Sequence, residues 1–228
     1  ATTIQRRLSA LRSFYRFGLT RGYVTKNPAR GIVGPKRSRP LPQFLRESEM
    51  NRLLDDMPVG DSYRELLAYI IVLVFYSTGM RLAELVGLDD DNIDFDTRVI
   101  KVLGKGSKQR LIPFADELEE GLRIYVARRD AEVVRKDKAF FVDQRGQRVK
   151  RGAVQNSVRA SLAKVTSMKK RSPHVLRHTF ATAMLNNEAG LESVKKLLGH
   201  ESLSTTEIYT HTTFEQLKKI YDKAHPRA

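Results

Sequence analysis

The chain has 228 residues, of which 41% are hydrophobic; Lys and Arg number 41 against 26 Asp and Glu, giving a formal net charge of +15, and there is no cysteine. This length suits one large domain, or one domain with a smaller piece attached. The lack of cysteine excludes disulfides and thiolate metal sites and agrees with a reducing, cytoplasmic setting. The longest apolar run, residues 70–76, is far too short to span a bilayer, so no membrane partner is expected.

The positive charge is concentrated in two segments. Residues 1–40 hold ten Lys or Arg, and residues 144–171 hold nine, and neither segment contains an acidic residue. A merely soluble surface usually mixes both signs, whereas acid-free basic segments are typical of proteins that bind the nucleic-acid backbone. We therefore expect a nucleic-acid ligand. The residues expected to contact it are Arg6, Arg12, Arg16, Lys36, Arg37, Lys108, Arg110, Arg148, Lys150 and Arg151.

The first residues predict one amphipathic helix followed by a linker. An apolar stripe recurs at helical spacing, and Gly18 and Gly22 mark its end; the stripe consists of Ile4, Leu8, Leu11, Tyr15 and Leu19. One helix cannot bury its own stripe, so we expect residues 1–26 to be the last part of a helical module whose start precedes Ala1. Residues 27–42, rich in Pro and Gly, predict a fairly stiff linker. The main domain is expected over residues 43–228.

That domain is predicted to be mainly α-helical with a small three-stranded antiparallel sheet. A short helix is expected from Ser48 to Leu54 and a buried one over residues 63–76, which Gly79 ends. Period-two alternation predicts strands over residues 92–95, 99–103 and 109–113, the last two joined by a tip with two lysines. A helix over residues 116–129 and a minor hairpin near residues 140–149 follow, and the remainder is expected to be helical.

The segment Ser172-Pro173-His174-Val175-Leu176-Arg177 has the pattern of an anion-binding helix start. Ser172 is a good N-cap and Pro173 suits the first turn, so His174 and Arg177 share one face at the positive end of the helix dipole. Free amides, a His and an Arg together suit a phosphate. Taken alone, the motif favours an anion site but is also compatible with a surface His and an Arg that lies along the surface.

A second candidate lies near the C-terminal end of the chain. The helix predicted over residues 191–198 stops at Gly199, and His200 follows directly. Ser204 and Glu207 then match a capping box, which places Tyr209 in the second turn of another helix. Tyr209 stands in polar sequence, but an isolated tyrosine in such a setting is more often a packing residue than a nucleophile.

The order of these residues along the chain resembles the tyrosine site-specific recombinases, and within them the Xer branch. The match runs from about residue 41 to the end, and what departs from the family pattern is the start, where most of the core-binding domain is absent. The matching motifs are residues 78–85 (TGMRLAEL), 104–110 (GKGSKQR), 174–182 (HVLRHTFAT), 197–200 (LLGH) and 205–211 (TTEIYTH). The six positions that the resemblance marks as catalytic are Arg81, Lys105, His174, Arg177, His200 and Tyr209.

The resemblance implies cleavage of DNA through a 3′-phosphotyrosyl link to Tyr209. Two permanently charged arginines suit the nonbridging oxygens of the reacting phosphate, and a His titrates where a general acid/base must. The link keeps the phosphodiester energy, so neither ATP nor another cofactor is expected. No metal is expected either, since no carboxylate cluster with metal-ligand spacing is visible.

Double-stranded DNA with a specific site and a tetramer of recombinase protomers are the implied partners, with a division-linked DNA translocase as a regulator. The implied role is chromosome dimer resolution. Alternatives are a mobile-element integrase, a type IB topoisomerase and a DNA-binding protein without catalysis. Two local questions stay open: whether Glu84 orients Arg81 or faces solvent, and whether a last helix, starting near Thr213, packs on its own chain or on a neighbouring protomer.

Overall fold

The computed structural model describes residues 2–35, 43–55, 62–104, 109–199 and 211–228. Its contacts divide the chain into two compact units, residues 1–42 and residues 43–228. None of the described helices is both long enough and apolar enough to cross a lipid bilayer.

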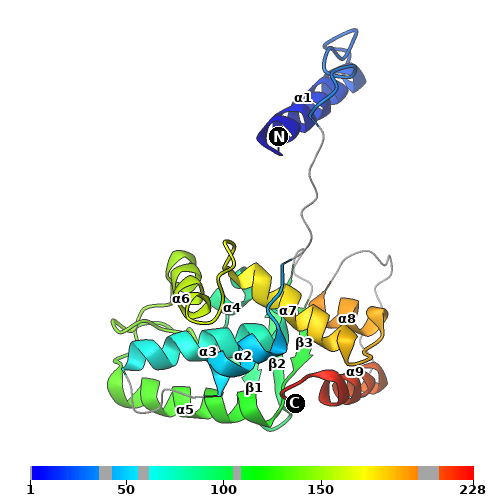
Figure 1. Cartoon of the computed structure of the whole chain (residues 1–228). Helices are drawn as coiled ribbons and strands as arrows, with labels where there is room; N and C mark the ends of the chain where they lie inside the picture. The colour runs from blue at the N-terminus through cyan, green and yellow to red at the C-terminus, as the bar shows by residue number, and fades with distance from the viewer. Residues whose placement is uncertain (1, 36–42, 56–61, 105–108, 200–210) are drawn as a thin grey trace. The chain divides into compact units, whose positions relative to one another are not determined.

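The first unit consists of helix α1 (Thr2–Thr20) and a segment that returns along it (Figure 1). Arg12 holds this segment, donating from Nε to the Ala29 carbonyl at 3.0 Å and from Nη2 to the Ile32 carbonyl at 2.5 Å. The first half of the predicted linker is therefore bound to the helix instead of being a free connection.

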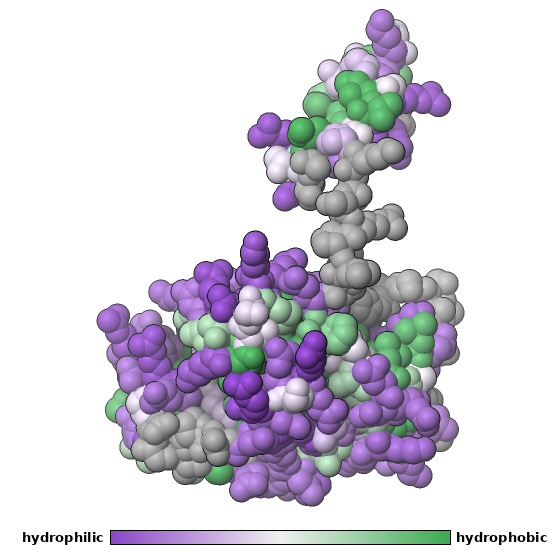
Figure 2. Space-filling model, in the orientation of Figure 1, coloured by the Kyte–Doolittle hydropathy of each residue, from purple (hydrophilic) through white to green (hydrophobic). Residues whose placement is uncertain are grey.

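The predicted apolar stripe of α1 exists but is largely uncovered within the first unit. Leu8 is buried, whereas Ile4, Leu11 and Leu19 are exposed. Apolar (green) surface is correspondingly visible on this unit in Figure 2.

The second unit is mainly helical, with one small sheet, as the sequence predicts. Helix α3 (Tyr63–Thr78) is its buried centre and packs against α5 (Asp116–Glu132), α6 (Arg151–Ala163) and α7 (Pro173–Asn186) (Figure 1). Twelve of its sixteen residues are buried, because it is covered by other elements on every side. Two shorter helices flank it in the chain, α2 (Glu47–Leu54) and α4 (Leu82–Val86).

The sheet has the order β1-β2-β3 and is antiparallel throughout. It is formed by β1 (Ile93–Asp94), which follows the 3₁₀ turn η1 (Asp90–Asn92), by β2 (Val99–Leu103) and by β3 (Gln109–Pro113). Ile100 pairs with Ile112, and Val102 with Arg110. Since side chains alternate along a strand, Arg110 lies on the same inner face of β3 as the fully buried Ile112.

A second, smaller core joins α7, α8 (Leu191–Leu198) and α9 (His211–Ala224). Phe180 of α7, Leu197 of α8 and Tyr221 of α9 are at most 1% exposed. Helix α9 thus packs on its own chain in this structure, beside α8 (Figure 1). The residues after α9 anchor the end of this helix. Arg227 Nε donates to Glu117 Oε1 at 2.7 Å, and Arg227 Nη1 donates to Asp55 Oδ1 at 3.0 Å.

Candidate active site

Arg81 lies in the turn between α3 and α4, and the local sequence sets where this turn falls. Gly79 ends α3 in the left-handed conformation, with φ at 58°, and α4 begins after Arg81. The Glu84 carboxylate accepts from the Arg81 backbone N–H at 2.6 Å and from Arg81 Nη1 at 2.9 Å. One carboxylate therefore caps the start of α4 and orients the Arg81 guanidinium.

Glu84 is buried, and its main partner is Arg110 on β3. Arg110 Nη1 donates to Oε1 at 2.5 Å and Nη2 to Oε2 at 2.9 Å, while both side chains are at most 6% exposed. Burial alone would raise the pKa of Glu84, but the hydrogen bonds from Arg110 and Arg81 outweigh it and lower the pKa below its ordinary value. Glu84 is thus a structural anion that orients Arg81 and does not face solvent.

The C-terminal end of α8 is held by three arginines. Its last carbonyl groups lack partners within the helix and carry the negative end of the helix dipole. Arg110 Nε donates to the Leu197 carbonyl at 3.1 Å, Arg177 Nη2 to that of Leu198 at 2.8 Å, and Arg81 Nη2 to that of Gly199 at 2.9 Å. Three consecutive carbonyls therefore bring together arginines from β3, α7 and the turn before α4.

Arg177 is also tied to the end of α3. Its Nη1 donates to the Gly79 carbonyl at 2.7 Å, and the side chain is buried. Burial, followed by repulsion from Arg81 and Arg110, lowers the pKa of Arg177 to about 10. Arg177 is still protonated at neutral pH, so three positively charged guanidinium groups and the Glu84 carboxylate meet here among the residues that the structure describes.

His174 lies one turn before Arg177 at the start of α7. Pro173 occupies the first turn as predicted, but the Ser172 side chain makes no capping hydrogen bond. The His174 imidazole is exposed, and its Nε2 lies 3.1 Å from Nε2 of His178. Partial burial, then repulsion from His178 and Arg177, lowers the pKa of His174 below its ordinary value. The lowered pKa favours the neutral form of the imidazole.

Three of the six predicted catalytic residues are thus placed by the structure, and it brings Arg81 and Arg177 together at the end of α8. Lys105, His200 and Tyr209 lie outside the described residues, as do Lys36, Arg37 and Lys108. Four of the residues predicted to contact DNA are exposed, so the structure does not contradict these predictions: Arg6, Arg16, Lys150 and Arg151.

Arg110 requires a correction. It was expected to bind the DNA backbone, but it is buried and its guanidinium is occupied by Glu84 and Leu197. The alternation of β3 was the signal that the prediction overlooked, because it puts Arg110 on the same face as Ile112. An inward arginine needs a carboxylate, and Glu84 is that partner. Arg110 is therefore the residue of the site whose role sequence reasoning missed.

Arg148 requires the same kind of correction. Its Nη2 donates to Asp89 Oδ1 at 2.6 Å and to Asp137 Oδ1 at 3.0 Å, and its Nη1 donates to the Leu88 carbonyl at 3.1 Å. Arg148 thus ties the segment after α4 to the loop after α5, and its charge is neutralised within the domain.

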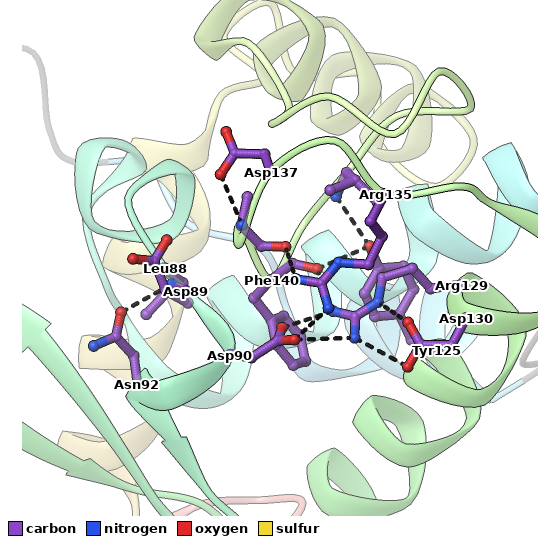
Figure 3. A network of polar contacts seen from close by, with 12 residues as sticks. Leu88, Asp89, Asp90, Asn92, Tyr125, Arg129, Asp130, Arg135, Asp137 and Phe140 are labelled. Atoms are coloured by element: carbon purple, nitrogen blue, oxygen red, sulfur yellow. Dashed lines mark hydrogen bonds and ion pairs between the residues drawn. The ribbon is translucent and has the colours of Figure 1, made fainter.

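Next to Arg148 is a network around the buried Arg129, which Figure 3 shows. Arg129 Nη1 donates to Asp90 Oδ1 at 2.8 Å and to the Phe140 carbonyl at 2.9 Å, and Arg135 Nη1 donates to Asp90 Oδ2 at 2.5 Å. These arginines hold the folded domain together and do not point to a ligand. Arg12, engaged with the segment after α1, is likewise occupied within its own unit.

Residues 43–216 match the phage integrase family. The chain belongs to this family. It is therefore a tyrosine recombinase, an enzyme that cuts and rejoins DNA, and the resemblance drawn from its motifs is confirmed.

Similar proteins place it near the Xer branch. It is 39% identical to the tyrosine recombinase XerC of Chlorobaculum tepidum over 99% of this chain and 74% of that protein. With XerC of Xanthomonas axonopodis pv. citri the identity is 42%, over 100% of this chain and 73% of the relative. Among solved structures, XerA recombinase is similar, with a TM-score of 0.63 and 28% identity over 97% of this chain and 84% of that one.

The fold has a further parallel in the Tn1549 transposon integrase in complex with transposon right end DNA. The TM-score is 0.74 with 21% identity, over 97% of this chain and 78% of that one. The predicted fold class, mainly α with a three-stranded antiparallel sheet of the tyrosine recombinase type, is confirmed.

Proposed function

We propose that this chain is a Xer-type site-specific recombinase that breaks and rejoins DNA through a phosphotyrosyl link, with Tyr209 as the nucleophile. The observation that carries the proposal is the convergence of Arg81 and Arg177 on the end of α8, directly before His200 in the chain. Two planar, permanently charged donors fixed beside each other suit the two nonbridging oxygens of a phosphodiester.

In the proposed reaction, the Tyr209 hydroxyl attacks the phosphorus and loses its proton to His174. The bond to the 5′ oxygen breaks, Lys105 protonates that oxygen, and a 3′-phosphotyrosyl link and a free 5′-hydroxyl result. Arg81 and Arg177 stabilise the charge that develops on the nonbridging oxygens, and His200 donates a hydrogen bond to the phosphate. Rejoining reverses these steps with another 5′-hydroxyl, so the reaction requires neither ATP nor a metal ion.

Duplex DNA and further recombinase protomers are the proposed partners. Support comes from the similar XerH recombinase, whose structure is a post-cleavage complex with its difH substrate, at 25% identity and a TM-score of 0.67. The XerC names of the relatives support the Xer-type assignment. The role proposed with it is chromosome dimer resolution in the cytoplasm, under the control of a division-linked DNA translocase. An integrase of a mobile element would use the same residues, and the DNA sequence that the enzyme cleaves distinguishes the two.

A suicide-substrate assay tests the nucleophile. DNA nicked beside the cleavage site should trap a covalent adduct with the unaltered protein and none with Tyr209→Phe. Tyr23→Phe is the matched control, since Tyr23 is exposed on the first unit and outside the site, and it should still form the adduct. An adduct that persists in Tyr209→Phe would show that another residue is the nucleophile. If the unaltered protein forms no adduct on its own site, a DNA-binding function without catalysis is favoured.

A further inference from the structure

His174 and His178 form a pair on one face of α7. They are four residues apart, which places both rings on neighbouring turns of the same helix face. The two Nε2 atoms lie 3.1 Å apart, and the ring centroids lie 4.4 Å apart in an edge-to-face arrangement. A contact of this length between two imidazole nitrogens requires one shared proton, with one nitrogen donating and the other accepting. The two nitrogens are therefore close enough to share one ligand.

The same distance fits a metal chelate. Two Zn–N bonds of about 2.0–2.1 Å that meet at roughly 90–110° place the nitrogens roughly 2.9–3.4 Å apart. A divalent ion can thus replace the shared proton without a change of backbone or helix register. Two histidines at this helical spacing are a known arrangement for zinc ligation in other proteins.

The surroundings determine which ions the pair accepts. His174 is exposed and His178 half-buried, so an ion has access from solvent. Arg177 and Lys170 are near enough to oppose positive charge at His174, which disfavours hard ions that rely on charge alone. Imidazole prefers the later first-row ions, Zn²⁺, Ni²⁺ and Cu²⁺. Among the described residues, no third His, Cys, Asp or Glu completes a metal cluster, so water or phosphate oxygens would fill the other positions.

We propose that His174 and His178 form a two-histidine binding site for a late first-row divalent ion such as Zn²⁺ or Ni²⁺, and that an ion bound there inhibits DNA cleavage. The inhibitory part rests on the proposed role of His174 as general acid/base, because the metal occupies the nitrogen that would carry the proton. The bound ion inhibits reversibly, and the ion itself has no part in the reaction.

Binding is tested first, by equilibrium dialysis of the untagged full chain against Zn²⁺ and Ni²⁺, with Mg²⁺ as the control ion. One Zn²⁺ or Ni²⁺ per chain is expected, and no Mg²⁺. His178→Asn and His174→Asn should each weaken binding at least roughly tenfold, equivalent to about 1.4 kcal/mol. His211→Asn, which leaves the pair intact, should bind as the unaltered chain does. Equal binding by the unaltered chain and His178→Asn would overturn the site, and so would loss of binding in His211→Asn alone.

Inhibition is tested in the suicide-substrate assay, with each protein compared with its own metal-free rate. Zn²⁺ at the concentration that saturates binding should suppress adduct formation by the unaltered chain, and EDTA should restore it. The His178→Asn variant, which retains His174, should lose this sensitivity to Zn²⁺. Equal inhibition of both proteins would overturn the inhibitory part. Failure of every protein to form an adduct would contradict the proposed function and leave the dialysis result standing.

Discussion

Glu84 and Arg110 face each other through two hydrogen bonds, from Nη1 to Oε1 at 2.5 Å and from Nη2 to Oε2 at 2.9 Å, and both side chains are buried. The pair links α4 to β3, and each partner also contacts the candidate active site. Glu84 holds Arg81, and Arg110 holds the end of α8. Its removal should therefore affect stability and activity together.

Replacement of Glu84 by Gln should lower the free energy of unfolding by about 3 kcal/mol, because breaking a buried ion pair leaves uncompensated charge inside the domain. Urea unfolding measures the change. The matched control is Glu132→Gln, which removes the partner of Arg128 in a helix-surface pair of α5 and should cost less than about 1 kcal/mol. Similar losses for the two variants would contradict the structural role given to Glu84.

Replacement of Arg110 by Lys should slow adduct formation about tenfold or more while leaving DNA affinity nearly unchanged, since a lysine keeps the charge but cannot make three directed hydrogen bonds. The comparison is Arg151→Gln at an exposed position, which should weaken DNA binding and reduce its salt dependence by roughly one phosphate contact. Salt titrations of DNA binding by fluorescence anisotropy separate the two. A loss of DNA affinity in Arg110→Lys as large as that in Arg151→Gln would restore Arg110 as a DNA-backbone residue.

The stability of the second unit should fall as the pH drops from about 6.5 to about 4. Burial against Tyr76, Phe180 and Tyr221 lowers the pKa of His225 from 6.5 to about 4. Between these values the unfolded chain binds a proton that the native chain does not, so stability is present above pH 6.5 and is lost on acidification. The loss amounts to about 3 kcal/mol.

His225→Phe keeps a ring in the stack but cannot be protonated. Urea unfolding between pH 7 and pH 5, where few carboxylates titrate, should give a flatter dependence for this variant than for the unaltered chain. The variant should also be less stable at pH 7, because it loses the contact of Nε2 with the Tyr76 carbonyl at 3.3 Å. An identical pH slope in both proteins would show that His225 is not the titrating group.

Gly79→Ala should destabilise the protein by roughly 2–4 kcal/mol and slow cleavage. The residue has φ at 58°, and an added Cβ would lie 2.5 Å from Phe180 Cδ1 and 2.8 Å from Leu198 Cδ2, so backbone strain and overpacking add. The Gly79 carbonyl would move with it and release Arg177. Gly152→Ala is the control: it is in helix α6 with nothing within 4 Å, and should be neutral or stabilising by up to about 1 kcal/mol. Thermal unfolding of both variants decides, and a neutral Gly79→Ala would contradict the close packing described.

Local signals in the sequence predicted the elements well where a residue's own backbone preference decides the outcome. Gly79 and Gly199 end their helices in the left-handed conformation, as expected of glycines after apolar helical runs. The start of α2 was misplaced at Ser48, because the N-cap is Arg46 and its backbone N–H donates to the Glu49 side chain at 2.8 Å. The Glu49 side chain thus caps the helix start in place of the predicted Ser48 side chain. The sequence pattern alone does not distinguish these two ways of capping.

The site was predictable only in part, because its contacts join residues far apart in the chain. The motifs predict Arg81, His174 and Arg177 as catalytic candidates from the order of residue types alone, and this stays a prediction. Nothing local to residue 110 reveals that its partners are Glu84 and Leu197, which approach only when β3, α4 and α8 pack together. Charge alone therefore predicts DNA contacts for Arg110, next to the lysine-bearing tip, and for Arg148, in an acid-free segment, although the fold uses both charges internally.

The arginines at the end of α8 have a thermodynamic consequence. Glu84 binds Arg81 and Arg110, Arg177 donates to the Gly79 and Leu198 carbonyls, and the backbone carbonyl dipoles at the end of α8 supply further compensation to all three arginines. The pKa of Arg177 is lowered first by burial and then by repulsion from Arg81 and Arg110. A phosphate group that enters the site would relieve this repulsion. Part of the stability of the folded protein is therefore gained only when an anion binds. We expect bound DNA to raise the free energy of unfolding by more than its contacts with the protein surface alone would contribute.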